Sequence, residues 1–466
     1  MNSLSYISTR GLAPALDLRG ATMAGLAVDG GLYVPAAWPS FSASDIAAMK
    51  GKPYAEIAQR VLSPFVEGVI APQDLRRLID TAYASFADPS VVAPLKQLDD
   101  KLWILELFHG PTLAFKDVAL QLLGGMFEHF LSASGERMTV IGATSGDTGS
   151  AAMAALAGRR NVDVFILYPD KGPSEIQRKQ MTCMEAPNVH AMAVEGSFDD
   201  CQATVKALFN DQALRAKYKF AAVNSINLMR ILAQVVYYFA AVSAFEGKQV
   251  SFVVPSGNFG NVFAGYAAKR CGVPIAKLAV ASNSNDILTR FFASGRMKGE
   301  GVHATLSPSM DIQISSNFER LLFDLCGRDA ASLRAMMEAQ KSCGTFEVTL
   351  EQLATARQTF TAACADDELT LKTIADVHKQ CGMILDPHTA VGVAAARQLA
   401  SELPEPVVCL ATAHPAKFPD TVRKAIGTAP ALPPFVEAQM SRPERTALLP
   451  PTAEAVMGYI APKVKV

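Results

Sequence analysis

Short apolar runs alternate with stretches of helical character along most of this chain. The apolar runs have the length of strands, and they lie at 102–108, 138–142, 162–168, 189–194, 250–254, 276–281 and 407–411. Helical patterns separate them, among them the nearly all-apolar stretch 118–131 and the alanine-rich stretch 262–270. Buried strands that alternate with helices are typical of a doubly wound sheet. The pattern therefore predicts an α/β fold in which two such units face each other.

The alternation of strands and helices extends from about residue 102 to residue 427. We place domain boundaries where this alternation is interrupted or absent. Residues 96–440 are the predicted main region, with a small α/β subdomain at about 130–225 and a large one made from the remainder. A helix-rich insertion is expected within the large subdomain at 290–375. Residues 1–95 are irregular and punctuated by prolines, and residues 441–466 are expected to form a C-terminal tail.

A single lysine, Lys116, is placed between the first buried strand and the apolar helix that follows it. Gly110-Pro111 breaks the chain after the strand, and Lys116-Asp117 leads into the stretch 118–131. Burial and the helix dipole both disfavour an ammonium at such a helix start, so the pKa of Lys116 should be lowered. The free amine could then attack an aldehyde and form a Schiff base. The alternative is a solvated surface lysine, as most lysines are.

A glycine-rich turn follows the strand at 250–254 and opens the helical stretch 262–270. The turn consists of Ser256, Gly257, Asn258, Phe259, Gly260 and Asn261. Its glycines allow a ligand to approach the backbone, and the N–H groups at a helix start favour a phosphate dianion. The turn lacks the lysine and hydroxyl residue of a Walker loop and the spacing of a dinucleotide fingerprint. An ordinary turn is the alternative, because Gly-Asn pairs are common in turns.

Two further strands end in polar residues. The strand at 138–142 leads into Ala143-Thr-Ser-Gly-Asp-Thr-Gly149, whose hydroxyls and free N–H groups would hold a carboxylate. Asp147-Thr-Gly149 also matches an aspartic-protease tripeptide, but the chain has no second copy to supply the paired carboxylate, so that interpretation is discarded. The strand at 407–411 leads into Thr412, His414 and Lys417. Ligands of open α/β sheets bind at the carboxyl ends of strands, where all four segments place their polar residues.

Bulk properties exclude several classes of function. The chain has 466 residues, enough for two or three domains, and a formal net charge of −1 without a basic run, which argues against nucleic acid as a partner. No signal peptide is evident, and the most apolar helical run, 231–245, is too short to span a membrane. The 8 cysteines form no C-x-x-C pair and no zinc-binding spacing. We therefore expect a cytoplasmic protein with reduced thiols, no metal site, and a monomeric or homodimeric state.

Taken together, these segments resemble the threonine synthase family of fold type II pyridoxal-phosphate enzymes, in its bacterial and fungal long-form branch. The resemblance spans roughly residues 6 to 426. It is carried by Phe115-Lys-Asp117, by the turn 143–149, by Pro255-Ser-Gly-Asn-Phe-Gly260, by Thr412-Ala-His-Pro-Ala-Lys-Phe418, by Tyr6-Ile-Ser-Thr-Arg-Gly11, by Asp29-Gly-Gly-Leu-Tyr-Val-Pro35, by Asn224-Ser-Ile-Asn227 with Arg230, by Met310-Asp311 and by Asp386-Pro-His-Thr-Ala-Val-Gly392. In this family the N-terminal region forms its own domain, which here would be residues 1–95.

The resemblance implies a cofactor, pyridoxal 5'-phosphate, and a role for each segment. Lys116 would form the Schiff base with the cofactor and then act as the proton shuttle. The loop from Ser256 to Asn261 would hold the cofactor phosphate, and the Thr412 hydroxyl would meet the pyridine nitrogen, a neutral partner that weakens the electron sink. The substrate carboxylate would be bound by the turn that contains Thr144, Ser145, Gly146, Asp147 and Thr148.

The implied reaction converts O-phospho-L-homoserine and water into L-threonine and phosphate, the last step of threonine biosynthesis. It requires γ-elimination, then β-addition of water, and a cationic pocket for the leaving phosphate. Arg178, Arg230 and Lys417 are the candidates for that pocket, although each could instead form an ordinary ion pair. Two alternatives stay open: a phospho-lyase that converts the same substrate to 2-oxobutyrate, and a non-catalytic regulatory protein, which the presence of Lys116 disfavours. Dehydratase or cysteine-synthase activity is a weaker alternative.

Overall fold

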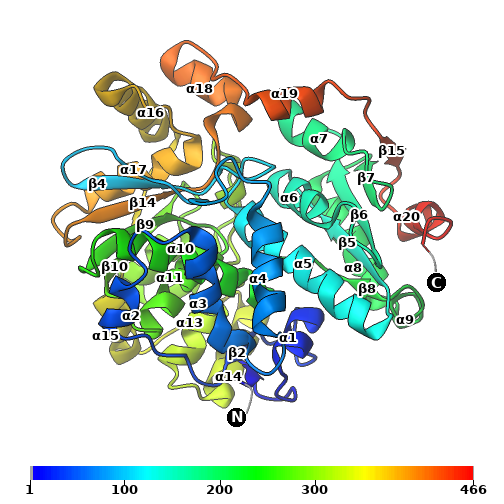
Figure 1. Ribbon diagram of the computed structural model, residues 1–466, viewed down its shortest axis with the longest axis horizontal. Helices are drawn as coiled ribbons and strands as arrows, with labels where there is room; N and C mark the ends of the chain where they lie inside the picture. Colours follow the sequence, from blue (N-terminus) through cyan, green and yellow to red (C-terminus); the bar gives the residue numbers. More distant parts are fainter. Residues whose placement is uncertain (1–3, 465–466) are drawn as a thin grey trace.

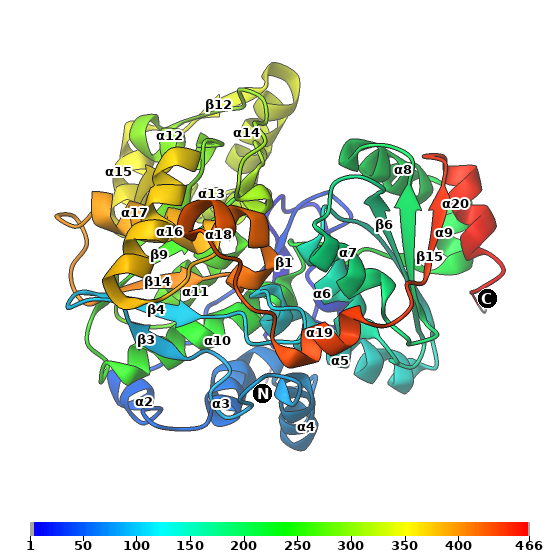
Figure 2. The ribbon, with the colours of Figure 1, turned by 90° about the horizontal axis from the view of Figure 1, so that it is seen from above.

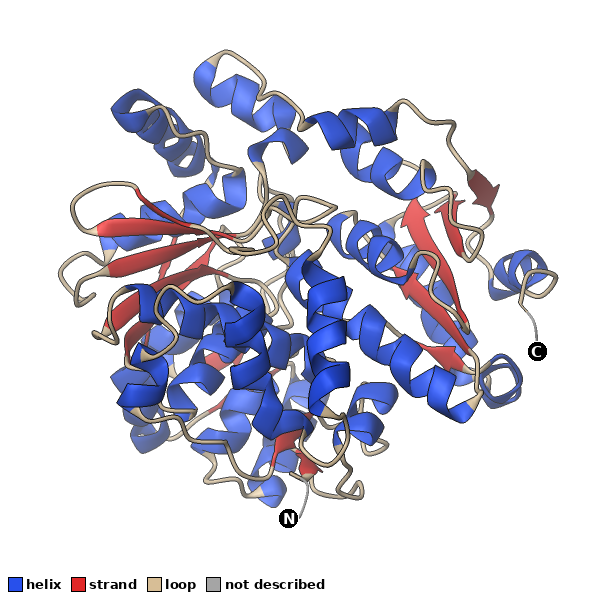
Figure 3. Ribbon diagram, viewed as in Figure 1, coloured by secondary structure: helices blue, strands red, loops and turns tan. Residues whose placement is uncertain are grey.

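The chain is organised by two larger sheets that stand side by side (Figures 1 and 3). The computed structural model describes residues 4–464. The large sheet has six strands, in the order β13 (Phe360–Cys364), β10 (Ile275–Ser282), β9 (Val250–Pro255), β14 (Val407–Ala411), β4 (Leu102–Glu106) and β3 (Leu95–Gln97). Its neighbouring strands run parallel except for the edge pair β3–β4.

The small sheet is parallel throughout and has five strands. Their order is β15 (Thr446–Leu449), β7 (Val189–Val194), β6 (Val162–Pro169), β5 (Met138–Ala143) and β8 (Phe220–Ala221). Every residue of the central strand β6 is buried, because helices cover both faces of the sheet. The predicted α/β fold is thus confirmed, and each predicted apolar run forms a strand.

Several strands lie where no strand was expected, among them the sheet-edge strands β3, β8, β13 and β15. β13 falls inside the predicted helical insertion 290–375, and it pairs with β10 at the edge of the large sheet. β15 falls inside the predicted tail 441–466, where it pairs with β7, and helix α20 (Ala453–Ile460) packs on α8 (Phe198–Asn210). Figure 2 shows this C-terminal segment in red beside the green small subdomain. The segment after residue 440 therefore completes the small subdomain.

The remaining elements surround the two sheets. The N-terminal region contains β1 (Tyr6–Ser8), α1 (Leu18–Ala24), β2 (Tyr33–Pro35), α2 (Ala43–Ala47), α3 (Tyr54–Val66) and α4 (Pro72–Tyr83). The small subdomain adds α6 (Asp147–Leu156), α7 (Glu175–Thr182) and α9 (Gln212–Tyr218). The large subdomain adds α12 (Ile287–Ser294), β11 (Arg296–Lys298), the 3-10 turn η1 (Pro308–Met310), α13 (Phe318–Leu325), α14 (Ala330–Cys343), β12 (Thr345–Glu347), α15 (Leu350–Thr359), α16 (Asp367–Cys381), α17 (Pro387–Gln398), η2 (Pro415–Lys417) and α18 (Pro419–Ile426). Helix α19 (Pro434–Met440) packs on α7 of the small subdomain.

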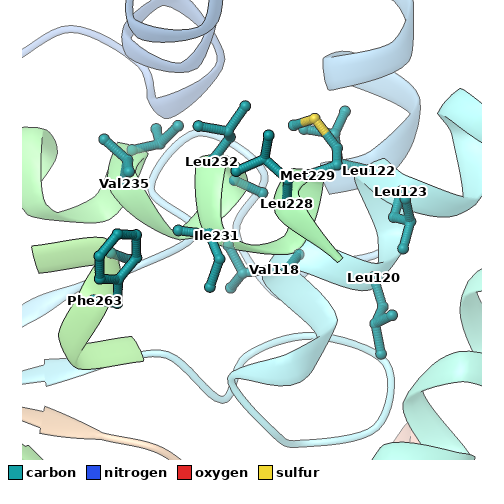
Figure 4. Close-up of a cluster of buried hydrophobic side chains, with 14 of the residues drawn as sticks. Val118, Leu120, Leu122, Leu123, Leu228, Met229, Ile231, Leu232, Val235 and Phe263 are labelled. Carbon is teal, nitrogen blue, oxygen red and sulfur yellow. The ribbon is translucent and has the colours of Figure 1, made fainter. Parts of the chain in front are cut away.

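Two apolar helices join the subdomains and hold the start of the site. The predicted helix after Lys116 is α5 (Lys116–Ser134), which packs against α10 (Leu228–Ala244), and α10 packs against α11 (Gly260–Arg270). Their shared core includes Val118, Ile231 and Phe263 (Figure 4). The N-terminal helices α3 and α4 cover α10 and α5 from outside. Because these helices are buried on most sides, the first turn of α5 is rigidly placed. Among the described residues, no helix combines the length and the apolar character needed to cross a bilayer.

Candidate active site

The four polar segments converge on one cavity of about 880 Å³. It is lined by Lys116 at the start of α5, by the end of β5, by the loop after β9 and by Thr412 after β14. All four lie at carboxyl ends of strands or at the helix starts that follow, as expected for an open parallel sheet. The residues from these segments that line the cavity are Lys116, Thr144, Ser145, Asp147, Thr148, Ser256, Gly257, Asn258, Phe259, Gly260, Asn261 and Thr412.

Lys116 is the first residue of α5, and its side chain is buried in the cavity wall. The segment before it is fixed to the end of β14, because the Phe115 N–H donates to the Thr412 carbonyl at 2.9 Å. Burial lowers the pKa of Lys116, and the nearby cations of Lys417 and Arg230 lower it further. The carboxylate of Asp147 acts in the opposite direction and raises it. The predicted direction of the shift is therefore present, and the Lys116 side chain faces the cavity.

Asp147 is the centre of the charge network. Its Oδ2 lies 3.2 Å from the Lys116 Nζ and its Oδ1 lies 2.8 Å from the Lys417 Nζ. The Gln177 Nε2 donates to Oδ1 at 2.9 Å. Burial alone would raise the pKa of Asp147, but the two ammonium groups and these hydrogen bonds hold that pKa well below its usual range. Asp147 is thus a buried carboxylate that positions both lysines.

The rest of the turn after β5 is shaped around Thr144. Its Oγ1 accepts hydrogen bonds from the N–H groups of Gly146 and Gly149, at 3.0 and 2.9 Å. Gly146 does not line the cavity, and a Cβ at that position would lie 2.6 Å from the side chain of Gln177. Ser145 and Thr148 face the cavity at the start of α6. This helix start offers N–H groups and hydroxyls to an anion.

The loop after β9 is closely packed against η1 and the residues after it. A Cβ on Gly257 would lie 3.0 Å from Ile312 Cγ1 and 3.1 Å from the Cα of Met310, so any larger residue would have to push η1 away from the loop. Phe259 adopts a φ of 60°, and its N–H donates to the Ser256 Oγ at 3.1 Å. The loop therefore presents the first turn of α11 to the cavity with backbone donors available for a phosphate.

The predicted phosphate-pocket cations lie in three different environments. Arg230 is buried in the cavity wall, and its Nε and Nη1 donate no hydrogen bond among residues 4–464. Burial lowers the pKa of Arg230 to about 10. Lys417 is fully buried, and besides Asp147 it contacts the Thr112 carbonyl at 2.7 Å. The structure does not bring Arg178 into the cavity; its guanidinium pairs with Glu444 near the C-terminus.

Two cavity residues had no role in the interpretation of the sequence. Ser309, in η1, and His388, at the start of α17, also line the cavity, and the Ser309 hydroxyl contacts Asp147. His388 lies within the Asp386–Gly392 motif, which was noted only for its resemblance. A single histidine carries no local signal of lying at a site, and the contact of His388 with Ser309 joins residues that are far apart in the chain.

The residues present fit pyridoxal phosphate. The cavity combines one buried amine of lowered pKa, a glycine-rich helix start for a phosphate, and a hydroxyl at Thr412. The orphaned donors of Arg230 add a second anion position, which a phosphorylated substrate would need. An aldehyde cofactor with a phosphate arm is therefore compatible with the donor set.

Family models cover nearly the whole chain. The model described as "Threonine synthase N terminus" matches residues 5–83, that for "Pyridoxal-phosphate dependent enzyme" matches residues 89–413, and that for "Threonine synthase, C-terminal" matches residues 389–460. The chain is 50% identical to a threonine synthase from Pseudomonas aeruginosa, with 98% of each chain covered.

Solved structures agree with these matches. The chain resembles a pyridoxal-phosphate-bound threonine synthase from Brucella melitensis with a TM-score of 0.97 and 49% identity, covering 100% of both chains. It resembles a yeast threonine synthase with a TM-score of 0.94 and 39% identity, covering 99% of both chains. The likeness therefore extends through the N-terminal region and the C-terminal segment as well as the two sheets.

Proposed function

This chain belongs to the threonine synthase family of pyridoxal-phosphate-dependent enzymes, and we propose that its cavity converts O-phospho-L-homoserine and water into L-threonine and phosphate. The observation that carries the assignment of the substrate is Arg230, a buried cation in the same cavity as Lys116 whose Nε and Nη1 find no partner within the described part of the chain. An unpaired buried cation is costly, so its place in a cavity is best explained by an anionic ligand.

The groups placed to hold the cofactor come from three segments that are far apart in the chain. When bound, pyridoxal phosphate supplies an aldehyde for an amine and a ring that stabilises negative charge beside the α-carbon of an amino acid. The Lys116 amine is placed for the aldehyde, and the loop 256–261 is placed for the phosphate. Thr412 offers a hydroxyl, and its backbone is fixed because its N–H donates to the Thr389 Oγ1 at 3.3 Å.

Lys116 would act as the proton carrier beside a bound substrate. Its ammonium form is disfavoured by burial and by Lys417 and Arg230, so the amine can accept a proton from the substrate α-carbon. Asp147 lies 3.2 Å from the Nζ and can stabilise the protonated form that results. The same side chain can therefore take up a proton and deliver it to a neighbouring carbon.

The substrate is oriented between two anion positions. Ser145 and Thr148, with the N–H groups at the start of α6, are placed to bind its carboxylate, whereas Arg230 is placed for its phosphate. Lys417 is committed to Asp147 and Thr112, so we assign it to the positioning of Asp147. Arg178 receives no role, because its partner is Glu444.

Replacing Arg230 with methionine should lower kcat/KM for O-phosphohomoserine by about 10- to 100-fold, because charge-assisted hydrogen bonds to the phosphate are lost. The same change should leave thermal stability unchanged or raise it, since it removes a buried cation that has unpartnered nitrogens. Steady-state kinetics and a melting curve would measure both effects. A lower melting temperature with unchanged kinetics would contradict the assignment of Arg230 to the substrate.

The product formed from O-phosphohomoserine tests the reaction itself. Purified, pyridoxal-loaded protein should release phosphate and L-threonine in equal amounts, measured by a phosphate assay and by chromatography of the amino acid. Phosphate with 2-oxobutyrate would instead assign the chain as a phospho-lyase, in which the intermediate leaves before water reaches the β-carbon. No phosphate and no carbon product would contradict both reactions and support a regulatory protein. The cytoplasmic location and the monomeric or homodimeric state stay predictions.

A further inference from the structure

His388 is held between a carboxylate and a backbone amide at the edge of the cavity. Its Nδ1 lies 2.8 Å from Asp386 Oδ1, and its Nε2 lies 3.2 Å from the N of Ser309. The imidazole is buried, and its ring packs on Phe418 with 4.9 Å between the ring centroids. Asp386 is itself fixed as the cap of α17, because it accepts the N–H of His388 at 2.9 Å.

These partners determine which nitrogen carries the proton. A carboxylate only accepts hydrogen bonds, so the Nδ1 of His388 must be the donor toward Asp386. The Nε2 is then the acceptor of the neutral ring, which matches the N–H that Ser309 directs at it. A backbone amide does not release its proton at neutral pH, so this contact holds Ser309 in place and does not carry a proton.

The turn that His388 holds touches both halves of the site. The Ser309 Oγ donates to Asp147 Oδ2 at 3.3 Å, the same oxygen that the Lys116 Nζ contacts. On its other side the turn places Met310 and Ile312 against Gly257 of the phosphate loop. Ser309 itself is exposed, so packing alone does not fix it. Its hydrogen bonds to His388 and to Asp147 therefore contribute to its position.

We propose that His388 is a positioning residue of this enzyme, which holds the turn η1 against Asp147 and the phosphate loop and so sets the placement of Lys116 and of the cofactor phosphate. The proposal rests on the proposed function for its kinetic consequence, whereas its effect on cofactor binding is independent of the substrate. Asp386, the partner of His388, has a second set of contacts. It also accepts a hydrogen bond from the hydroxyl of Thr389, and the Thr389 hydroxyl accepts one from the N–H of Thr412. Asp386 thus connects the turn to the cofactor-ring side of the cavity.

The test compares His388→Ala with His388→Gln, whose side-chain oxygen can accept the Ser309 N–H near the place of Nε2. We expect His388→Ala to raise the dissociation constant for pyridoxal phosphate and to lower kcat, each by about 5- to 100-fold. His388→Gln should recover most of both losses. Titration of the cofactor-free protein with pyridoxal phosphate, followed by the absorbance of its linkage to Lys116, measures the first constant without any substrate. His378→Ala, a partly exposed histidine on α16, is the matched control and should change neither value.

A double-mutant cycle tests whether His388 acts through Ser309. Ser309→Ala keeps the backbone N–H but removes the contact with Asp147, so the losses in His388→Ala and Ser309→Ala should overlap in the double variant. Additive losses, or a His388→Gln variant as impaired as His388→Ala, would overturn the proposal and assign His388 to packing against Phe418. Wild-type constants in His388→Ala would overturn it as well. If the wild-type protein forms no threonine, the proposed function fails, but the cofactor titrations of the same variants still decide the role of His388.

Discussion

Replacing Lys116 with alanine is expected to abolish the formation of threonine, with a loss of at least about 10²- to 10⁴-fold in kcat. The substitution removes two functions of the Lys116 amine. The cofactor loses the amine that holds its aldehyde, and the substrate loses the base that lies in the cavity with a lowered pKa. Asp147 cannot replace the base, because its own pKa is held well below the usual range, so it does not accept a proton at neutral pH.

Absorbance and kinetics together check this expectation. Pyridoxal phosphate added to Lys116→Ala should bind through its phosphate and ring without the visible absorbance of a lysine linkage. Lys372→Ala is the matched control, since Lys372 is exposed on α16 and pairs only with Asp376 in the part of the chain that the structure describes. Full threonine formation by Lys116→Ala would contradict the assigned role. A variant that no longer folds would be recognised by a melting temperature far below that of the control.

The location of the site could be predicted from the sequence because it depends on local patterns. Each of the four segments joins an apolar strand to a polar turn, and parallel strands bring their carboxyl ends to one edge. The pattern around Lys116 also predicts the direction of its pKa shift, since burial and the helix start act on the residue wherever the rest of the chain lies. For these segments, local and tertiary preferences agree.

The contacts inside the site could not be predicted, because they join residues that are far apart in the chain. Asp147 pairs with Lys417, and only the packing of η2 beside the small subdomain brings the two together. The sequence predicts that the turn 143–149 binds the carboxylate of a ligand. It does not reveal that Asp147, a carboxylate within this turn, forms ion pairs with Lys116 and Lys417. The contact between His388 and Ser309 has the same origin, since α17 and η1 meet only in the folded chain.

The unpredicted edge strands, such as β13 and β15, have a different cause. β13 consists mostly of alanine, threonine and cysteine, and β15 alternates between exposed and half-buried residues. Neither forms an apolar run, because each lies at the edge of its sheet and has a single neighbouring strand. Edge strands owe their conformation to the strand that they pair with, so a pattern of burial along the sequence does not reveal them.

Replacing Asp147 with alanine should destabilise the cofactor-free protein by about 3–5 kcal/mol, since it leaves buried cations without their counter-ion. Lys417 is fully buried and loses its ion-pair partner, and Lys116 loses the same partner. Asp147→Asn keeps an oxygen acceptor and the size of the side chain, so it should lower the free energy of unfolding by less than Asp147→Ala does. Urea unfolding at pH 7 would measure both, with Asp170→Ala as the control at an exposed aspartate.

The pH dependence of the stability difference between wild type and Asp147→Ala tests whether the charge of Asp147 causes that difference. The pKa of Asp147 is lowered in the folded protein, so its ionised form stabilises the fold at every pH above the ordinary carboxyl pKa of about 3.9. That stabilisation is lost as the pH falls through the lower folded pKa. The gap between wild type and Asp147→Ala should therefore be full at pH 7 and narrow below about pH 4. A stability difference that stays constant down to acid pH would mean that Asp147 contributes through its shape and hydrogen bonds. The proposed stabilisation by its charge beside Lys116 and Lys417 would then be wrong.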